Sequence, residues 1–135
     1  MNTNTITYTW ADEAKTIVHF TLYPGWTWEG YYAVNNDVAD MMRSVDHPVY
    51  FMLDHTRTSV VPVGVFMHAR NLFGAYPANC SLIVIVTPNI FVQRLVSIFQ
   101  STYKSGLGRR VKPAKSVEDA YQTIAKDKLR SAVTA

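Results

Sequence analysis

Two uninterrupted apolar runs constrain the fold more than any other feature of the sequence: "VYFML" at residues 49–53 and "LIVIV" at residues 82–86. Runs of this kind, without polar alternation, are typical of strands that are buried on both faces of a sheet. The chain between them has apolar residues at helical spacing, and Pro62 suits the first turn of a helix that begins near residues 60–62. Because parallel strands need such a crossover, the sequence predicts an α/β protein.

The segments before and after these runs extend the alternation. Residues 6–10 and 15–22 are rich in β-branched and aromatic side chains and are joined by the polar turn "ADEAK", which predicts an antiparallel hairpin. A weak fifth strand is expected at residues 110–113, where a proline indicates a sheet edge. The prediction is therefore a mixed sheet of four or five strands.

Three further amphipathic helices complete the pattern. One starts at Thr27, one covers about Asn89 to Tyr103, and the last begins at "SVED", residues 116–119, whose serine and acidic residue suit a helix N-terminus. The helix from Asn89 has an apolar surface wider than a single stripe, which predicts contact with another element or a second copy in a homodimer. Its apolar residues are Phe91, Val92, Leu95, Val96, Ile98 and Phe99.

The size and composition of the chain fit one domain spanning residues 1–135, in which residues 129–135 are expected to fray. With 48% hydrophobic and 17% charged residues, 135 residues can build a core of their own. The single cysteine, Cys80, cannot form an internal disulfide, and the first ten residues lack the pattern of a signal peptide. The longest aliphatic run is far shorter than a transmembrane helix, so we expect a cytoplasmic protein without a transmembrane segment.

The net charge of +3 does not by itself indicate a nucleic-acid partner. Five of the thirteen basic residues lie between Lys104 and Lys115 with no acidic residue among them. This segment contains neither interleaved aromatic side chains nor a groove-reading motif. A solvated turn is therefore the favoured interpretation, and nucleic-acid binding is not expected.

Several short motifs, in this order of elements, resemble the STAS-like proteins of the SpoIIAA-like group, whose fold is related to the CRAL-TRIO lipid-binding domains. The resemblance covers residues 5–128. It implies a small sheet with helices mostly on one side, and a non-enzymatic regulatory or ligand-sensing module that binds a protein partner or a small anionic or amphipathic ligand. The motifs that carry it are "GWTWEGYYA", "PVYFMLDHT", "NLFGAYPAN", "LIVIVTPNIFVQRL" and "SVEDAYQTI".

The phosphorylation site of the anti-sigma antagonist branch is not reproduced. In that branch the helix after the matching strand begins with Asp-Ser-Ser-Gly, and a serine is phosphorylated. Aligning the glycine on Gly64 places Val61, Pro62 and Val63 at the preceding positions, none of which can accept a phosphoryl group. Ser59 is the nearest hydroxyl, so the resemblance implies a module without the usual phosphorylatable serine.

The polar stretch after residue 53 leaves an alternative function open. Asp54, His55 and Ser59 have the side-chain types of a hydrolytic triad, which suggests a hydrolase or transferase as the alternative. The chain has no G-x-S-x-G nucleophile elbow, and turn and cap roles for Asp54, Thr58 and Ser59 are favoured. The enzyme hypothesis predicts that at least two of these polar groups converge in a concave pocket.

The same stretch is also the candidate ligand site. Ligands of open α/β sheets bind beyond the carboxyl end of a strand, and a helix N-terminus attracts anions. Arg57, Thr58 and Ser59 could then bind phosphate, sulphate or an acidic side chain, provided that Asp54 turns back into its own turn. No cofactor is predicted.

Metal ligation and cysteine chemistry find little support in the sequence. The four histidines do not form a pair at ligand spacing with a helper carboxylate or thiolate, so no metal site is predicted. Cys80 precedes a buried strand and is expected to be structural. Trp26 and Trp28 flank a helix start, where they are candidates for an exposed aromatic surface, although a core position is favoured for them.

Overall fold

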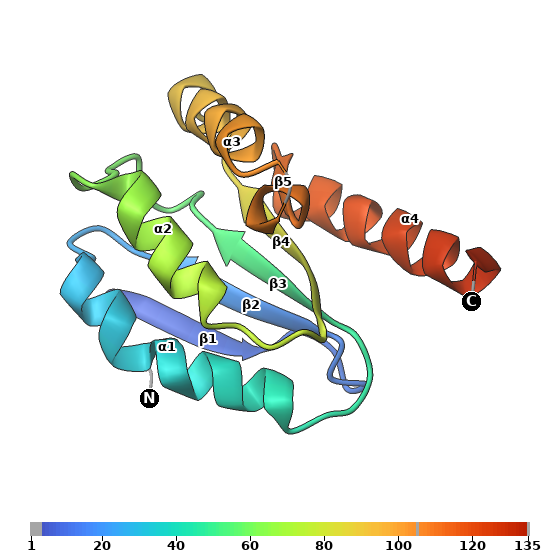
Figure 1. Cartoon of the computed structure of the whole chain (residues 1–135). Helices are drawn as coiled ribbons and strands as arrows, with labels where there is room; N and C mark the ends of the chain where they lie inside the picture. The colour runs from blue at the N-terminus through green and yellow to red at the C-terminus, as the bar shows by residue number, and fades with distance from the viewer. Residues whose placement is uncertain (1–3, 105, 135) are drawn as a thin grey trace.

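The computed structural model describes residues 4–104 and 106–134, which form a five-stranded mixed sheet with helices on both faces (Figure 1). This confirms the predicted fold class and the fifth strand. Along the chain the elements are β1 (Ile6–Trp10), β2 (Ile17–Leu22), α1 (Trp28–Arg43), β3 (Val49–Asp54), α2 (Val65–Gly74), β4 (Cys80–Val86), α3 (Ile90–Thr102), the 3₁₀ turn η1 (Leu107–Arg109), β5 (Val111–Ala114) and α4 (Val117–Thr134).

The strand order explains where the helices lie. The sheet runs β1-β2-β3-β4-β5, with β1 antiparallel to β2 and every other pair parallel. Crossovers between neighbouring parallel strands are right-handed, so successive crossovers in one direction place their helices on the same face. Helices α1, α2 and α3 therefore share one face, and α4, which follows the last strand, returns along the other.

Each face of the sheet has its own core. On the face of the first three helices, Phe20, Phe51 and Ile83 pack with residues of α1, α2 and α3. On the opposite face, the alternate strand residues pack against Ala120 and Ile124 of α4. Both apolar runs thus lie between two layers of helices, as the sequence pattern predicts, and only Ile85 among their residues is partly exposed.

One predicted boundary is wrong. Helix α2 begins at Val65, with Gly64 as its N-cap at φ 86°, and not near residues 60–62. Pro62 therefore lies in the β3–α2 loop, and the left-handed conformation at Gly64 redirects the chain into the helix. Helix α4 continues to Thr134, the expected fraying of residues 129–135 stays a prediction, and residue 135 lies outside the described residues.

In the ranges 4–104 and 106–134, none of the helices has the length and apolar composition that crossing a membrane requires.

Candidate functional site

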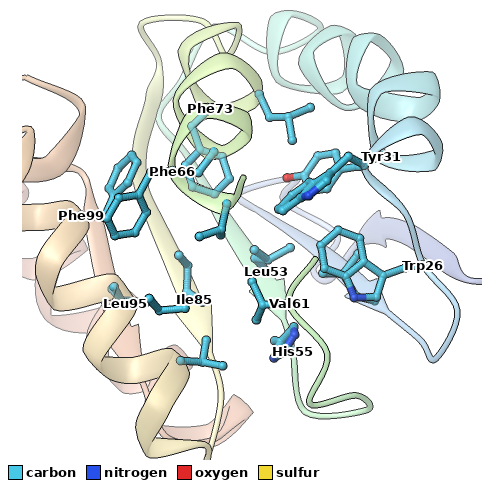
Figure 2. A pocket seen from close by; sticks show the side chains of 17 residues that line it. Trp26, Tyr31, Leu53, His55, Val61, Phe66, Phe73, Ile85, Leu95 and Phe99 are labelled. Atoms are coloured by element: carbon cyan, nitrogen blue, oxygen red, sulfur yellow. The ribbon is translucent and has the colours of Figure 1, made fainter. Parts of the chain in front are cut away.

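An apolar cleft opens beneath α2, on the face of the sheet that carries three helices. Its cavity is about 80 Å³ in volume, several times the roughly 10–15 Å³ that a single water needs. Leu53 of β3 and Ile85 of β4 form its floor, at the carboxyl ends of two neighbouring parallel strands. Figure 2 shows these two side chains between the aromatic residues of α1 and those of α2 and α3. The site therefore occupies the usual ligand position of an open α/β sheet.

The cleft exists because the strands beneath the three helices are too narrow for all three to pack closely on the sheet. Each crossover advances by one strand, about 4.8 Å, whereas packed helices need about 8–10 Å between their axes. Helix α2 is attached to α1, since His68 stacks on Trp28 with ring centroids 4.8 Å apart and forms a hydrogen bond with the Tyr32 hydroxyl. On its other side α2 meets α3 through ring contacts, and Ile85 stays partly exposed although it lies in a central strand.

Three aromatic rings form the wall of the cleft on the side of α2 and α3. Phe66 and Phe73 of α2 contact Phe99 of α3 edge-on, with ring centroids 6.0 and 6.3 Å apart. Leu95, one turn before Phe99 on α3, completes this wall and is partly exposed. Ring edges and a single leucine leave space between the two helices rather than closing it.

The wall at the α1 end contains the two tryptophans singled out in the sequence. Trp26 is buried, with 5% of its surface exposed, so the expectation that it belongs to an exposed aromatic surface is wrong and the core interpretation holds. Trp28 is partly buried and packs edge-on against Trp26 at 4.7 Å. Both rings line the cleft, together with Tyr31, because the loop of residues 55–64 folds over them.

That loop is fastened to the wall by indole and imidazole hydrogen bonds. Trp26 Nε1 donates to the Val60 carbonyl oxygen at 3.3 Å, and Trp28 Nε1 donates to the Val63 carbonyl oxygen at 2.9 Å. His55 Nε2 donates to the same Val60 oxygen at 3.0 Å, since a carbonyl can only accept. The loop therefore covers one end of the cleft as an ordered segment.

His55 is the polar side chain that borders the cleft most directly. It is 4% exposed, and its Nδ1 atom is buried without a hydrogen-bond partner among the described residues. His55 also borders a shallower polar hollow of about 450 Å³, formed by residues 55–59 and 87–89. An apolar compartment and a polar one thus meet at this residue.

Asp54 points away from the cleft, to the α4 face of the sheet. Its carboxylate pairs with His19 Nε2 at 2.8 Å and accepts the Thr56 backbone N–H at 2.9 Å and the Thr56 hydroxyl. Burial raises the pKa of Asp54. The hydrogen bonds from His19 and Thr56 together lower the pKa by more than burial raises it, so it lies below the usual value. The carboxylate is therefore ionised and bonded within its own turn. This meets the condition under which Arg57, Thr58 and Ser59 were expected to bind an anion.

The proposed triad does not assemble. Successive residues of a strand point to opposite faces, so Asp54 faces His19 while His55 faces the cleft. Ser59 is exposed, and no hydrogen bond joins Asp54, His55 and Ser59 in any pair within residues 54–59, all of which the structure describes. The convergence that the enzyme hypothesis requires is absent from these three residues.

The anion candidates Arg57, Thr58 and Ser59 lie in the polar hollow, away from the N-terminus of α2 but beside Asn89, the N-cap of α3. Because α2 begins at Val65, its free N–H groups are several residues away, and the Thr58 hydroxyl accepts from the Val60 N–H in a local turn. Arg57 and Ser59 are exposed at the hollow's rim. Anion binding by these residues stays a prediction, with the Arg57 guanidinium rather than the dipole of α2 as its main attraction.

Metal and thiol chemistry are not indicated by the geometry. In the part of the chain that the structure describes, no group of three or more His, Cys, Asp or Glu side chains could hold a metal ion. Burial raises the pKa of the Cys80 thiol to about 12, so the thiol stays protonated at neutral pH.

A comparison with family models and with curated proteins finds no match to this chain. The STAS-like resemblance therefore rests on the sequence motifs and on the order of elements. The sequence does not predict the cleft, because its lining residues follow the pattern of ordinary core residues. Ile85 and Ile83 occupy equivalent places in the apolar run "LIVIV".

Proposed function

We propose that the protein is a non-enzymatic STAS-like binding module whose cleft takes the apolar part of a small amphipathic ligand. The observation that carries the proposal is the partly exposed Ile85 at the floor of a cavity bordered almost entirely by apolar side chains. A central strand residue of a closed core would be fully buried, as Ile83 is. Apolar clefts of this kind take apolar guests.

The polar hollow beside the cleft supports an amphipathic ligand rather than a pure hydrocarbon. His55 borders both compartments, so a ligand with its apolar part over Ile85 would place a head group near Arg57. Thr58 and Ser59 add hydroxyls at the same rim. A guanidinium and hydroxyls favour an anionic head, such as a carboxylate.

The experiment is a titration with decanoate and with decanol, followed by the fluorescence of Trp26 and Trp28, two of the three tryptophans in the chain. Ala69 lines the cleft, so Ala69→Leu fills it and should weaken both ligands at least fivefold. The matched control is Ala125→Leu, a change of the same size at an exposed position of α4, which should bind as the wild type does. Equal binding by Ala69→Leu and Ala125→Leu would contradict the proposal.

The head-group assignment has its own variant. Arg57→Ala should weaken decanoate severalfold, because the carboxylate loses its cation, and should leave decanol unchanged. Loss of both ligands to the same extent would place the guanidinium outside the head-group site.

A further inference from the structure

The charges are unevenly divided along the chain, and the division follows the fold. Residues 1–54 contain seven acidic and two basic side chains, whereas residues 55–117 contain eight basic side chains and no acidic one. The second segment supplies α2, α3 and the loops at both ends of these helices. The surface that they build is therefore positive, with no carboxylate of its own segment to neutralise it.

The same segment exposes large apolar side chains. Val63 is 94% exposed, Phe91 65%, and Met67 and Ile98 51% each. On α3, Phe91 and Ile98 stand four residues before and three residues after Leu95, so they lie on the flank that borders the cleft. Phe91 and Ile98 thus flank the cleft, and Val63 and Met67 add exposed apolar surface on the loop before α2 and on α2 itself.

Arginines are interleaved with this apolar rim. Arg94 is exposed on α3 between Phe91 and Ile98, and Arg70 is exposed on α2, one turn after the cleft residue Phe66. The ion pairs found among the described residues join other parts of the chain, and none includes either arginine. Their charges remain available to a partner.

We infer that the α2–α3 face, defined by Val63, Met67, Arg70, Phe91, Arg94 and Ile98, docks on an anionic lipid surface. Apolar side chains interleaved with cations fit a bilayer whose acyl region accepts the former and whose head groups attract the latter. The cleft mouth would then face the membrane, but docking does not require that the cleft hold a ligand.

Charge favours this occupant over the two alternatives. A twofold homodimer through this face would bring the same positive surface against itself, which like charges oppose. A nucleic acid would use the arginines but would leave Val63, Met67 and Ile98 without a stacking role. An anionic bilayer uses both kinds of side chain at once.

The test is sedimentation with vesicles of phosphatidylcholine alone and of phosphatidylcholine mixed with phosphatidylserine. We expect binding to the mixed vesicles at low salt, weaker binding at high salt, and little binding to the neutral ones. Arg94→Glu should reduce binding about fivefold or more, since each basic residue near such a surface adds about that factor. Phe91→Ser should reduce it to a similar extent.

Matched controls lie on α4. Lys126→Glu changes the net charge by the same amount, and Leu129→Ser removes an apolar side chain that is 68% exposed; both should bind as the wild type does. Equal losses in the α3 and α4 variants, or no binding at low salt, would overturn the inference. So would a dimer in light scattering that Phe91→Ser dissociates, or a preference for DNA over anionic vesicles.

The filled variant Ala69→Leu separates this inference from the proposed function. It should lose decanoate yet keep vesicle binding, whereas Arg94→Glu should lose vesicles and keep decanol. Vesicle binding without decanoate binding in the wild type would refute the cleft alone. The reverse result would refute the docking face alone.

Discussion

The two faces of the sheet are covered by different numbers of helices, and the core beneath the single helix is closed whereas a cleft opens beneath the three. One helix, α4, packs on β3, β4 and β5, and its contact residues Ala120 and Ile124 are 0% and 1% exposed. Three helices cover the other face, yet Ile85 is partly exposed between two of them. Closure therefore depends on how helix spacing fits strand spacing, not on how many helices are present.

Polar contacts reinforce the closed core beneath α4. The Tyr50 hydroxyl donates to Asp127 of α4 at 2.8 Å, and Lys128 Nζ donates to the Thr16 hydroxyl at 2.8 Å. Burial, together with the Asp127 carboxylate, raises the pKa of Tyr50 to about 12, so the hydroxyl keeps its proton at neutral pH. On the open face, the polar contacts instead hold the loop of residues 55–64 to the tryptophans, at the rim of the cleft.

The largest effect is expected when one isoleucine on each face of the sheet is truncated. Ile124→Ala should lower the free energy of unfolding by about 3 kcal/mol, because it leaves a cavity in a sealed core. Ile85→Ala should cost about 1 kcal/mol, since its side chain already borders open space. Urea denaturation measures both values. Similar losses would mean that the cleft floor is packed as tightly as the core beneath α4.

A smaller effect concerns Asp54, whose pKa is lowered in the folded protein. A lowered folded pKa stabilises the native state above the unfolded pKa, near 3.9, and this stabilisation disappears as the pH falls through the folded pKa. Asp54→Asn should therefore cost about 1.5 kcal/mol at pH 7, as expected for hydrogen bonds to a charged group. The difference between wild type and variant should shrink below pH 4.

Urea denaturation at a series of pH values measures that difference. Asp46→Asn serves as a control, because Asp46 is an exposed residue of the loop between α1 and β3. If the cost of Asp54→Asn stayed constant from pH 7 to pH 2, the ionised carboxylate would not be the stabilising form.

The smallest effect should appear at the loop that covers the cleft. Trp28→Phe keeps an aromatic ring but removes the Nε1 hydrogen bond to the Val63 carbonyl oxygen. The free energy of unfolding should fall by about 1 kcal/mol or less. Amide hydrogen exchange within residues 60–64 should accelerate while exchange in β3 stays unchanged. Trp10→Phe, on β1, is the matched control. Unchanged exchange in the loop would show that other contacts hold it.

Much of the fold follows from local patterns in the sequence. The apolar runs predicted β3 and β4, and "SVED" predicted the start of α4, where the Ser116 hydroxyl accepts the Asp119 N–H. The start of α2 was misplaced because Pro62 is compatible with both a first helical turn and an extended loop. Local preference could not decide between these, whereas the hydrogen bonds from two distant tryptophans do.

The candidate site was predicted only in part. The sequence located the polar loop after β3, and Asp54 does turn back into its own turn with Thr56. It could not assign Asp54 and His55 to different surroundings, since their partners His19 and Val60 come from β2 and from the folded loop.

The sequence by itself determined the order of strands and helices, the two buried strands, and the long stretch without acidic residues, because each depends on the chemistry of neighbouring residues. The tertiary structure alone decided that α2 stays with α1 and leaves a cleft towards α3. That outcome depends on His68 stacking on Trp28, and on the mismatch between helix and strand widths. Such contacts join residues far apart in the chain, and no local pattern records them.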